Sequence, residues 1–326
     1  MSQVVMRFDM RCPANGDSSA ADLYQAVLDM SEWGDTRGID VIGLSEHHNT
    51  TDGFLPSPLN LASAIAARTR HALLSIGALL VPLHDPLRLA EDIAVLDLLS
   101  RGRLTVITGI GYREQEYLAL GRDWKRRGQL LEENIKVMQQ AWTGMPFDYR
   151  GTSVQVLPRP YSLPHPLLAI GGNSAPAARR AARLRLPFFP AIDDAELVKI
   201  YREACTEQDF SGGLVILPGY PTTTFLAEDV ELGWQQIGRY MLYDALAYGS
   251  WRHATRRAYA ESFAADLETL RAEGKYAVLT PAEALAKLRA GGSLHLAPLV
   301  GGAPPELGWQ SLRLFAEQVA PQLHSD

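Results

Sequence analysis

Residues 73–108 read LLSIGALLVPLHDPLRLAEDIAVLDLLSRGRLTVIT, and this stretch holds one full repeat of the pattern that decides the fold. An apolar run at Leu73–Val81 predicts a strand, and a second run at Leu104–Thr108 predicts another. Between them, apolar residues from Leu89 to Leu96 recur at the spacing of an amphipathic helix. A strand, a helix and a strand in this order indicate two parallel strands joined by a crossover helix.

The same unit recurs along the whole chain of 326 residues. Eight strand–helix units predict an α/β protein with a parallel sheet covered by helices. The G-x-G-x-x-G fingerprint of an open dinucleotide-binding sheet is absent near the N-terminus, so we expect a closed (β/α)8 TIM barrel with insertions. The other six strands are expected at Val4–Met10, Asp40–Leu44, Leu167–Ile170, Pro187–Ile192, Leu214–Leu217 and Ser293–Val300.

The chain shows no linker, repeat or low-complexity segment, so we expect a single domain over residues 1–326. Two insertions interrupt the barrel pattern. A turn at Arg150–Gly151 predicts a small hairpin within 147–157, and residues 248–274 are expected to form a helical insertion. The proline-rich stretch Pro218–Thr224 is predicted to be a loop, and Thr280 is predicted to cap a short helix over Pro281–Leu288.

Composition excludes several classes of function. The net charge is −6 and no basic stripe is present, which argues against nucleic acid as a partner. No apolar run approaches the ~20 residues of a membrane-spanning helix, and the N-terminus does not resemble a secretory signal. Cys12 and Cys205 lack the spacing of metal ligands and are compatible with a reducing compartment, so we expect a cytoplasmic protein.

In a TIM barrel the active site lies at the carboxyl ends of the strands. Glu46, His47 and His48 directly follow the second predicted strand. Histidine exchanges protons near neutral pH, so this group holds our candidate catalytic residues: Glu46 and at least one of the histidines His47 and His48. Neighbouring residues on a strand point to opposite sides, so one ion would hardly bind both histidines, and we expect no metal site.

The other histidines are weaker candidates. His71, His84 and His253 are expected in loops or at the surface, whereas His295 lies on the last predicted strand and is expected to face the barrel mouth.

Small residues at three other strand ends suit the binding of a flat, phosphorylated ligand. Glycine lets the backbone approach such a ligand closely, and exposed amides at the start of a helix attract phosphate. We expect Ser174 to be the N-cap of the helix that follows the fifth strand, with nearby arginines adding positive charge. The candidate cofactor-binding residues are Gly77, Ala78, Gly109, Gly111, Gly171, Gly172, Asn173, Ser174 and Arg179, with Arg180 beside them.

These segments together resemble the luciferase-like monooxygenase family, also called the bacterial luciferase superfamily. Each motif alone is weak, but the ordered set is specific and spans nearly the whole chain. The matching segments are 44–48 (LSEHH), 82–86 (PLHDP), 90–92 (AED), 100–104 (SRGRL), 109–112 (GIGY), 116–121, 141–143 (AWT), 171–174 (GGNS), 179–182 (RRAA), 279–283 (LTPAE) and 311–316 (SLRLFA).

The resemblance implies a barrel that holds reduced flavin mononucleotide (FMN), with its phosphate near Asn173 and Ser174. It also implies that His47 is the catalytic histidine and that a cis peptide bond not involving proline lies at Gly77–Ala78. The arginine that binds phosphate in light-emitting members corresponds here to Ile110, so Arg179 or Arg180 would have to take its place.

The implied function is oxidation of a small organic substrate with oxygen and with reduced FMN from a separate reductase. Family members commonly form homodimers, here expected through the helices after strands two and three. Two other cofactor roles remain open: hydride transfer with the deazaflavin coenzyme F420, and flavin binding without catalysis. A metal-dependent hydrolase on the same barrel is a further alternative.

Overall fold

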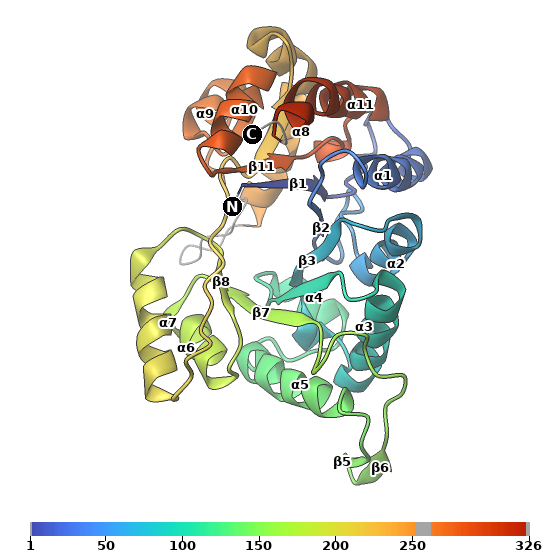
Figure 1. Cartoon of the computed structure of the whole chain (residues 1–326), viewed down its shortest axis with the longest axis vertical. Coiled ribbons are helices and arrows are strands. Elements are labelled where there is room, and N and C mark those ends of the chain that lie inside the picture. The colour runs from blue at the N-terminus through green and yellow to red at the C-terminus, as the bar shows by residue number, and fades with distance from the viewer. Residues whose placement is uncertain (1, 252–261, 324–326) are drawn as a thin grey trace.

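The computed structural model describes residues 2–251 and 262–323 (Figure 1). Parallel strands alternate with helices along the chain, which confirms the predicted α/β class. The strands are β1 (Gln3–Phe8), β2 (Val41–Leu44), β3 (Leu73–Leu79), β4 (Leu104–Thr108), β5 (Phe147–Tyr149), β6 (Thr152–Val154), β7 (Leu167–Gly172), β8 (Phe188–Pro190), β9 (Thr223–Leu226), β10 (Tyr276–Leu279) and β11 (Ser293–Leu296).

The helices begin where the sequence provides a cap or a proline in the first turn. Asp85, for example, caps α3 by accepting the backbone N–H groups of Leu87 and Arg88. Thr280 and Glu283 form a capping box at the start of α10, as the sequence predicts for Thr280. The helices are α1 (Ala20–Gly34), α2 (Pro58–Arg68), α3 (Pro86–Ser100), α4 (Glu114–Ala119), α5 (Arg127–Ala141), α6 (Ala175–Arg183), α7 (Ala195–Glu207), α8 (Val230–Ser250), α9 (Leu267–Glu273), α10 (Pro281–Arg289) and α11 (Pro305–Leu314), with short turns η1 (Val81–Leu83), η2 (Val300–Gly302), η3 (Phe315–Val319) and η4 (Ala320–Gln322).

The large sheet has the strand order β10-β9-β11-β1-β2-β3-β4-β7-β8, and every pair of neighbours is parallel. The carboxyl ends of all these strands therefore meet at one edge. Strands β1, β2, β3 and β4 follow one another in sequence and in space, as a β/α barrel requires. The register of β3 against β4 shifts between Gly77 and Leu79, at the place where the site is built.

One segment touches both ends of this sheet. Val215 forms an isolated parallel bridge with Phe188 of β8, supported by backbone hydrogen bonds at Leu214 and Ile216. The chain then continues into β9, which pairs with β10 and β11 near the opposite end of the sheet. Residues 214–226 thus connect the two ends and bring the strands into a barrel-like ring.

The structure corrects two details of the predicted strand pattern. Leu214–Leu217 makes only the single bridge, whereas the strand in this region is β9, which begins inside the stretch predicted to be a loop. The β-branched residues Thr223 and Thr224 favour a strand, but the prolines just before them concealed it. Strand β10 was not predicted, and it falls directly after the segment expected to be helical.

The structure describes the first expected insertion completely and the second in part. The hairpin is present as the antiparallel pair β5–β6, which projects from the end of the molecule opposite α9 and α10 (Figure 1). Of residues 248–274, the first belong to the end of α8 and the last to α9, while 252–261, including His253, lie outside the described residues. No helix among the described residues is long and apolar enough to cross a membrane.

Helix α5 supports the loop that carries part of the site. Trp142, the residue after this helix, is fully buried, and its indole N–H donates to the carbonyl oxygen of Ala90 on α3 over 2.9 Å. About two turns earlier on α5, the Asn134 amide donates to the carbonyl oxygens of Val81 (3.0 Å) and His84 (3.3 Å). Packing of α5 on α3 therefore fixes the position of the η1 loop.

We expect Trp142→Ala to lower the free energy of unfolding by about 3–5 kcal/mol, because it leaves a cavity and removes the donor to Ala90. Leu118→Ala, at a side chain that is 70% exposed, is the control and should change it by less than about 0.5 kcal/mol. Chemical denaturation of both variants measures the difference, and equal midpoints would contradict the packing described for α5.

Candidate functional site

A cavity of about 1210 Å³ occupies the interior of the ring and is lined by residues from both the amino and the carboxyl ends of the strands. Alternate residues of each strand face it, as the pleat requires. Many of these inward positions hold small side chains, including Gly43, Ser75, Gly77, Gly109 and Gly171. A TIM barrel usually fills this space with bulky side chains, so a large interior cavity points to ligand binding.

Two histidines that are neighbours in sequence point to opposite sides of the chain, as expected. His47 lines the cavity, whereas His48 turns away from it and contacts Glu46. Glu46 lines the cavity too and is 1% exposed. The sequence therefore places the two candidate catalytic residues correctly at the cavity wall.

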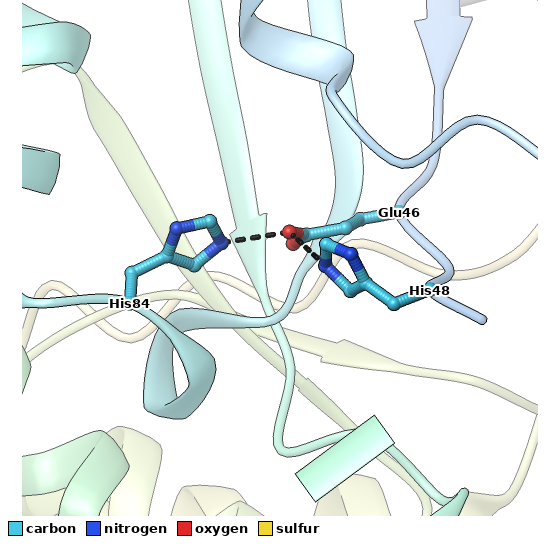
Figure 2. A group of neighbouring side chains, drawn as sticks. All are labelled: Glu46, His48 and His84. Atoms are coloured by element: carbon cyan, nitrogen blue, oxygen red, sulfur yellow. Dashed lines mark hydrogen bonds and ion pairs between the residues drawn. The ribbon is translucent and has the colours of Figure 1, made fainter. Parts of the chain in front are cut away.

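The Glu46 carboxylate has hydrogen-bond partners on both oxygens. Its Oε1 atom accepts from Nε2 of His48 (2.8 Å) and Nε2 of His84 (2.7 Å), and Oε2 accepts from the Leu80 backbone N–H (Figure 2). Burial on its own raises the pKa of Glu46, but the bonds from His48 and His84 outweigh it and lower the pKa to about 2. Glu46 is thus a fixed carboxylate, and the geometry fits a positioning role better than proton donation.

His84 is one of the residues near the site that sequence reasoning missed. It was expected to be a loop or surface residue, yet it lies in direct contact with Glu46. The adjacency of β2 and β3 brings the two together, and no local sequence signal reports that pairing.

His47 lies between a carboxylate and a phenol. Its Nδ1 atom is 3.2 Å from Oε1 of Glu116, and its Nε2 atom is 3.1 Å from the Tyr112 hydroxyl. An ionised carboxylate only accepts, so Nδ1 carries the proton and Nε2 accepts from Tyr112. The edge of Phe54 packs on the same imidazole, with ring centroids 4.7 Å apart, and Trp251 lies 4.8 Å away.

Burial lowers the pKa of His47 below its usual value. Glu116 opposes this effect, while the positive charges of Arg11 and Arg113 add to it. The imidazole is therefore neutral at pH 7. Burial, together with Tyr248 and Glu116, holds the pKa of Tyr112 well above its usual value, so the phenol remains a donor.

Glu116 of α4 organises this side of the site. Its Oε1 atom also accepts from the His48 backbone N–H (2.9 Å) and from Nη1 of Arg113 (3.1 Å). The other oxygen, Oε2, is buried and has no hydrogen-bond partner among the residues the structure describes. Sequence reasoning included residues 116–121 in the resemblance but gave Glu116 no role.

The wall of the cavity is closely packed around the predicted cofactor-binding glycines. The Gly77–Ala78 peptide is cis, as the resemblance implies. A Cβ atom on Gly109 would lie only 2.8 Å from the Cβ atom of Ala78, so no side chain fits there. Gly111 has φ +66°, a conformation that favours glycine. All four residues line the cavity.

Cationic residues lie near the carboxyl end of β7, which is the fifth strand of the predicted barrel. Gly171, Gly172, Asn173 and Ser174 line the cavity, and Ser174 is the N-cap of α6, although its side chain makes no capping bond. Arg179 is exposed and does not line the cavity. One residue along a helix turns by about 100°, so Arg180 faces the cavity instead, with Nε 3.1 Å from Oε1 of Glu132. The geometry therefore favours Arg180 over the predicted Arg179.

Further cations and aromatic groups complete the wall. Lys125 and Arg127 line the same cavity, and the basic run at 125–127 was the sequence signal that could have identified them. Tyr248 and Trp251 line it from the end of α8. Both rings pack on the guanidinium of Arg11 at 4.9 and 4.8 Å.

Arg11 explains how α8 is attached to the barrel. The guanidinium is fully buried and forms ion pairs with Asp52 and with Asp244 of α8, the latter at 2.7 Å. A buried cation needs such partners, because desolvation otherwise costs several kcal/mol. The aromatic residues of α8 are thereby held against the His47 side of the cavity.

His295, the weaker candidate, also lines the cavity. Burial, with Arg7 and Lys287 nearby, lowers its pKa to about 4, so it is neutral at pH 7.

We expect Glu116→Gln to lower the pKa of His47 further, because the carboxylate is the group that raises it. NMR titration of the His47 ring protons, assigned with a His47→Asn variant, measures the midpoint. Glu114→Gln, an exposed carboxylate on the same helix, is the control and should leave the midpoint unchanged. An unchanged or higher midpoint in Glu116→Gln would contradict the assigned contact.

Comparison with known proteins agrees with this geometry. Residues 6–291 match the family model described as luciferase-like monooxygenase. The oxygenase component of the flavin-dependent trigonelline monooxygenase of Acinetobacter baylyi is 32% identical over 148 residues, which are 44% of this chain and 40% of that protein. The chain thus spans about half the length, or less, of the first curated relatives it matches.

Solved structures resemble the whole chain. The monooxygenase RslO1 of Streptomyces bottropensis has a TM-score of 0.79 at 26% identity, with 98% of this chain and 99% of that chain covered. The oxygenating constituent of 3,6-diketocamphane monooxygenase of Pseudomonas putida, solved with FMN, has a TM-score of 0.72 at 21% identity, with 99% of both chains covered. An F420-dependent secondary alcohol dehydrogenase has a TM-score of 0.69 at 14% identity, with both chains covered completely. The last two show a shared fold, and the family match over residues 6–291 shows that this chain belongs to the luciferase-like monooxygenase family.

Proposed function

We propose that this protein is the oxygenase component of a two-component flavin monooxygenase. It binds reduced FMN from a separate flavin reductase and uses oxygen to oxidise a small organic substrate. The observation that carries the proposal is the neutral, buried His47 at the wall of a cavity that is also lined by the cations Lys125, Arg127 and Arg180.

The size of the cavity supports two ligands at once. Sites for one small molecule usually measure about 300–1,000 Å³. The cavity here, at about 1210 Å³, leaves room for a flavin and an organic substrate together.

The residues fit the parts of FMN. Arg180, Lys125, Arg127 and the start of α6 suit the phosphate, because charged donors and helix amides both favour anions. The wall formed by Gly77, Ala78 and Gly109 carries no large side chain, so it suits the flat ring system. Asn173 and Ser174 lie beside the proposed phosphate position.

Bound reduced FMN supplies the electrons that activate oxygen. His47 offers a neutral imidazole whose protonation is set by Glu116 and Tyr112, so it can accept or return a proton at Nε2. Phe54 and Trp251 pack around it and exclude water.

Partners and location complete the proposal. The reductase is proposed because the sequence lacks a convincing nicotinamide site, and a relative is named as an oxygenase component. A homodimer through α2 and α3 is supported by Val95, Leu98 and Leu99, apolar side chains of α3 that are 39–50% exposed. A cytoplasmic location and a single domain over residues 1–326 remain predictions.

The first test is an anaerobic fluorescence titration of the apoprotein with reduced FMN and, separately, with reduced F420. We expect selective binding of reduced FMN. Selective binding of F420 would instead assign hydride transfer, and binding of neither would exclude both cofactors.

Arg180→Leu should weaken binding of reduced FMN about 10–100-fold, because it removes a charge-assisted contact to phosphate. It should leave the affinity for reduced riboflavin, which has no phosphate, unchanged. Arg179→Leu is the matched control on the same helix and should bind both ligands like the wild type. Equal weakening for both ligands would contradict a phosphate role for Arg180.

His47→Asn should slow substrate oxidation by about 10²–10⁴-fold, because a proton-transfer group is lost. Binding of reduced FMN should change little, since the proposed flavin contacts lie elsewhere in the cavity. Single-turnover kinetics after mixing with oxygen measure the first effect, and the titration above measures the second. Wild-type kinetics in this variant would favour a protein that binds flavin without catalysis.

A further inference from the structure

Three potential metal ligands converge where the chain leaves β2 and η1, close to His47. Glu46 and His48 follow β2, and His84 follows η1, so they come from separate parts of the chain (Figure 2). One ligand atom from each residue lies within 4.8 Å of the other two. Figure 2 shows both imidazoles directed at the end of the Glu46 side chain.

The chemistry of this set suits a divalent cation. Two imidazole nitrogens and one carboxylate oxygen are ligands that Zn²⁺ prefers, usually with water in a fourth position. Tetrahedral Zn²⁺ at about 2.0–2.2 Å from each ligand places ligand atoms about 3.3 Å apart. The present separations from Glu46 Oε1 to the two Nε2 atoms are 2.7 and 2.8 Å. Binding requires the Nε2 proton of each histidine to leave, so that each ring becomes the Nδ1–H tautomer and offers its Nε2 lone pair to the ion. A shift of about half an ångström at each side chain then opens the position.

Surrounding hydrogen bonds already fix the ligands. The second oxygen of Glu46 accepts from the Leu80 N–H. The Asn134 side-chain amide donates to the backbone carbonyl oxygen of His84, and the backbone N–H of His48 donates to the Glu116 carboxylate. Such outer contacts orient ligands in metal sites and reduce the reorganisation that binding requires.

An ion can reach the site without crossing the flavin cavity. The Glu46 side chain is fully buried, but those of His48 and His84 are 18% and 31% exposed. Glu46 lines the cavity, whereas neither histidine does. The cation would therefore lie on the solvent side of the carboxylate, where water can complete its coordination.

We propose that Glu46, His48 and His84 form a binding site for a divalent cation of the Zn²⁺ type. The sequence argument excluded a metal bound by both His47 and His48, and that exclusion still holds. His48 instead pairs with His84, which the sequence argument did not consider as a ligand. A bound ion ties the end of β2 to the loop after η1 and holds the carboxylate beside His47. This inference does not depend on the proposed flavin chemistry.

The experiment uses the full-length, untagged protein, treated with chelator and desalted, without flavin. Isothermal titration with Zn²⁺ should reveal one saturable site per chain. His48→Ala and His84→Ala should each weaken it at least 100-fold, more than the roughly 10–100-fold expected for an outer contact. His71→Ala, an exposed histidine outside the cluster, should bind like the wild type.

His84→Asn, which keeps a polar side chain, replaces His84→Ala if circular dichroism shows that the alanine variant is unfolded. Zn²⁺ should also raise the melting temperature of the wild type and of His71→Ala, but not of the His48 and His84 variants. Absence of a saturable site in the wild type would overturn the proposal. Zn²⁺ binding of wild-type strength in either ligand variant would overturn it as well.

Discussion

A buried carboxylate is stable only where donors surround it, and the mouth of this cavity is arranged around two such groups. Glu46 holds the loop after η1 through His84, and Glu116 holds α4 against the loop after β2. His47 lies between them, with its tautomer set by Glu116. The geometry around His47 thus depends on the donors that gather at Glu46 and at one oxygen of Glu116.

The large interior cavity follows from the residues on the inner faces of the strands. Gly77, Gly109 and Gly171 add no side chains there, and Ser75 and Thr105 add only short polar ones. The core of the protein lies instead between the sheet and the helices, where Trp142 and its neighbours pack. Stability is therefore provided outside the ring, and the inside is left for ligands.

Much of this was accessible from the sequence because strand ends carry the site in any parallel barrel. That rule selected Glu46, His47, His48 and the glycine turns as a group, and the family resemblance then singled out His47. His84 was not found, since it lies 38 residues from Glu46 and meets it only through the pairing of β2 with β3. Arg179 and Arg180 are neighbours on one helix and point in directions about 100° apart. Helix ends read from sequence are uncertain by one or two residues, so the sequence could not decide which arginine faces the cavity. Strand β9 was hidden because prolines just before it dominated the local pattern.

The ring is not equally strong all the way round. Strands β1 to β4 are joined by four or five registered pairs each, but the contact between β8 and residues 214–217 is a single bridge. Local opening costs least where the fewest hydrogen bonds must break. Ile216 to Tyr220, directly after that bridge, line the cavity. Strand β9 likewise meets β11 through one registered pair, so residues 214–226 are joined to the rest of the ring by a single pair on each side, and local opening of this segment would widen access to the cavity at the lowest cost.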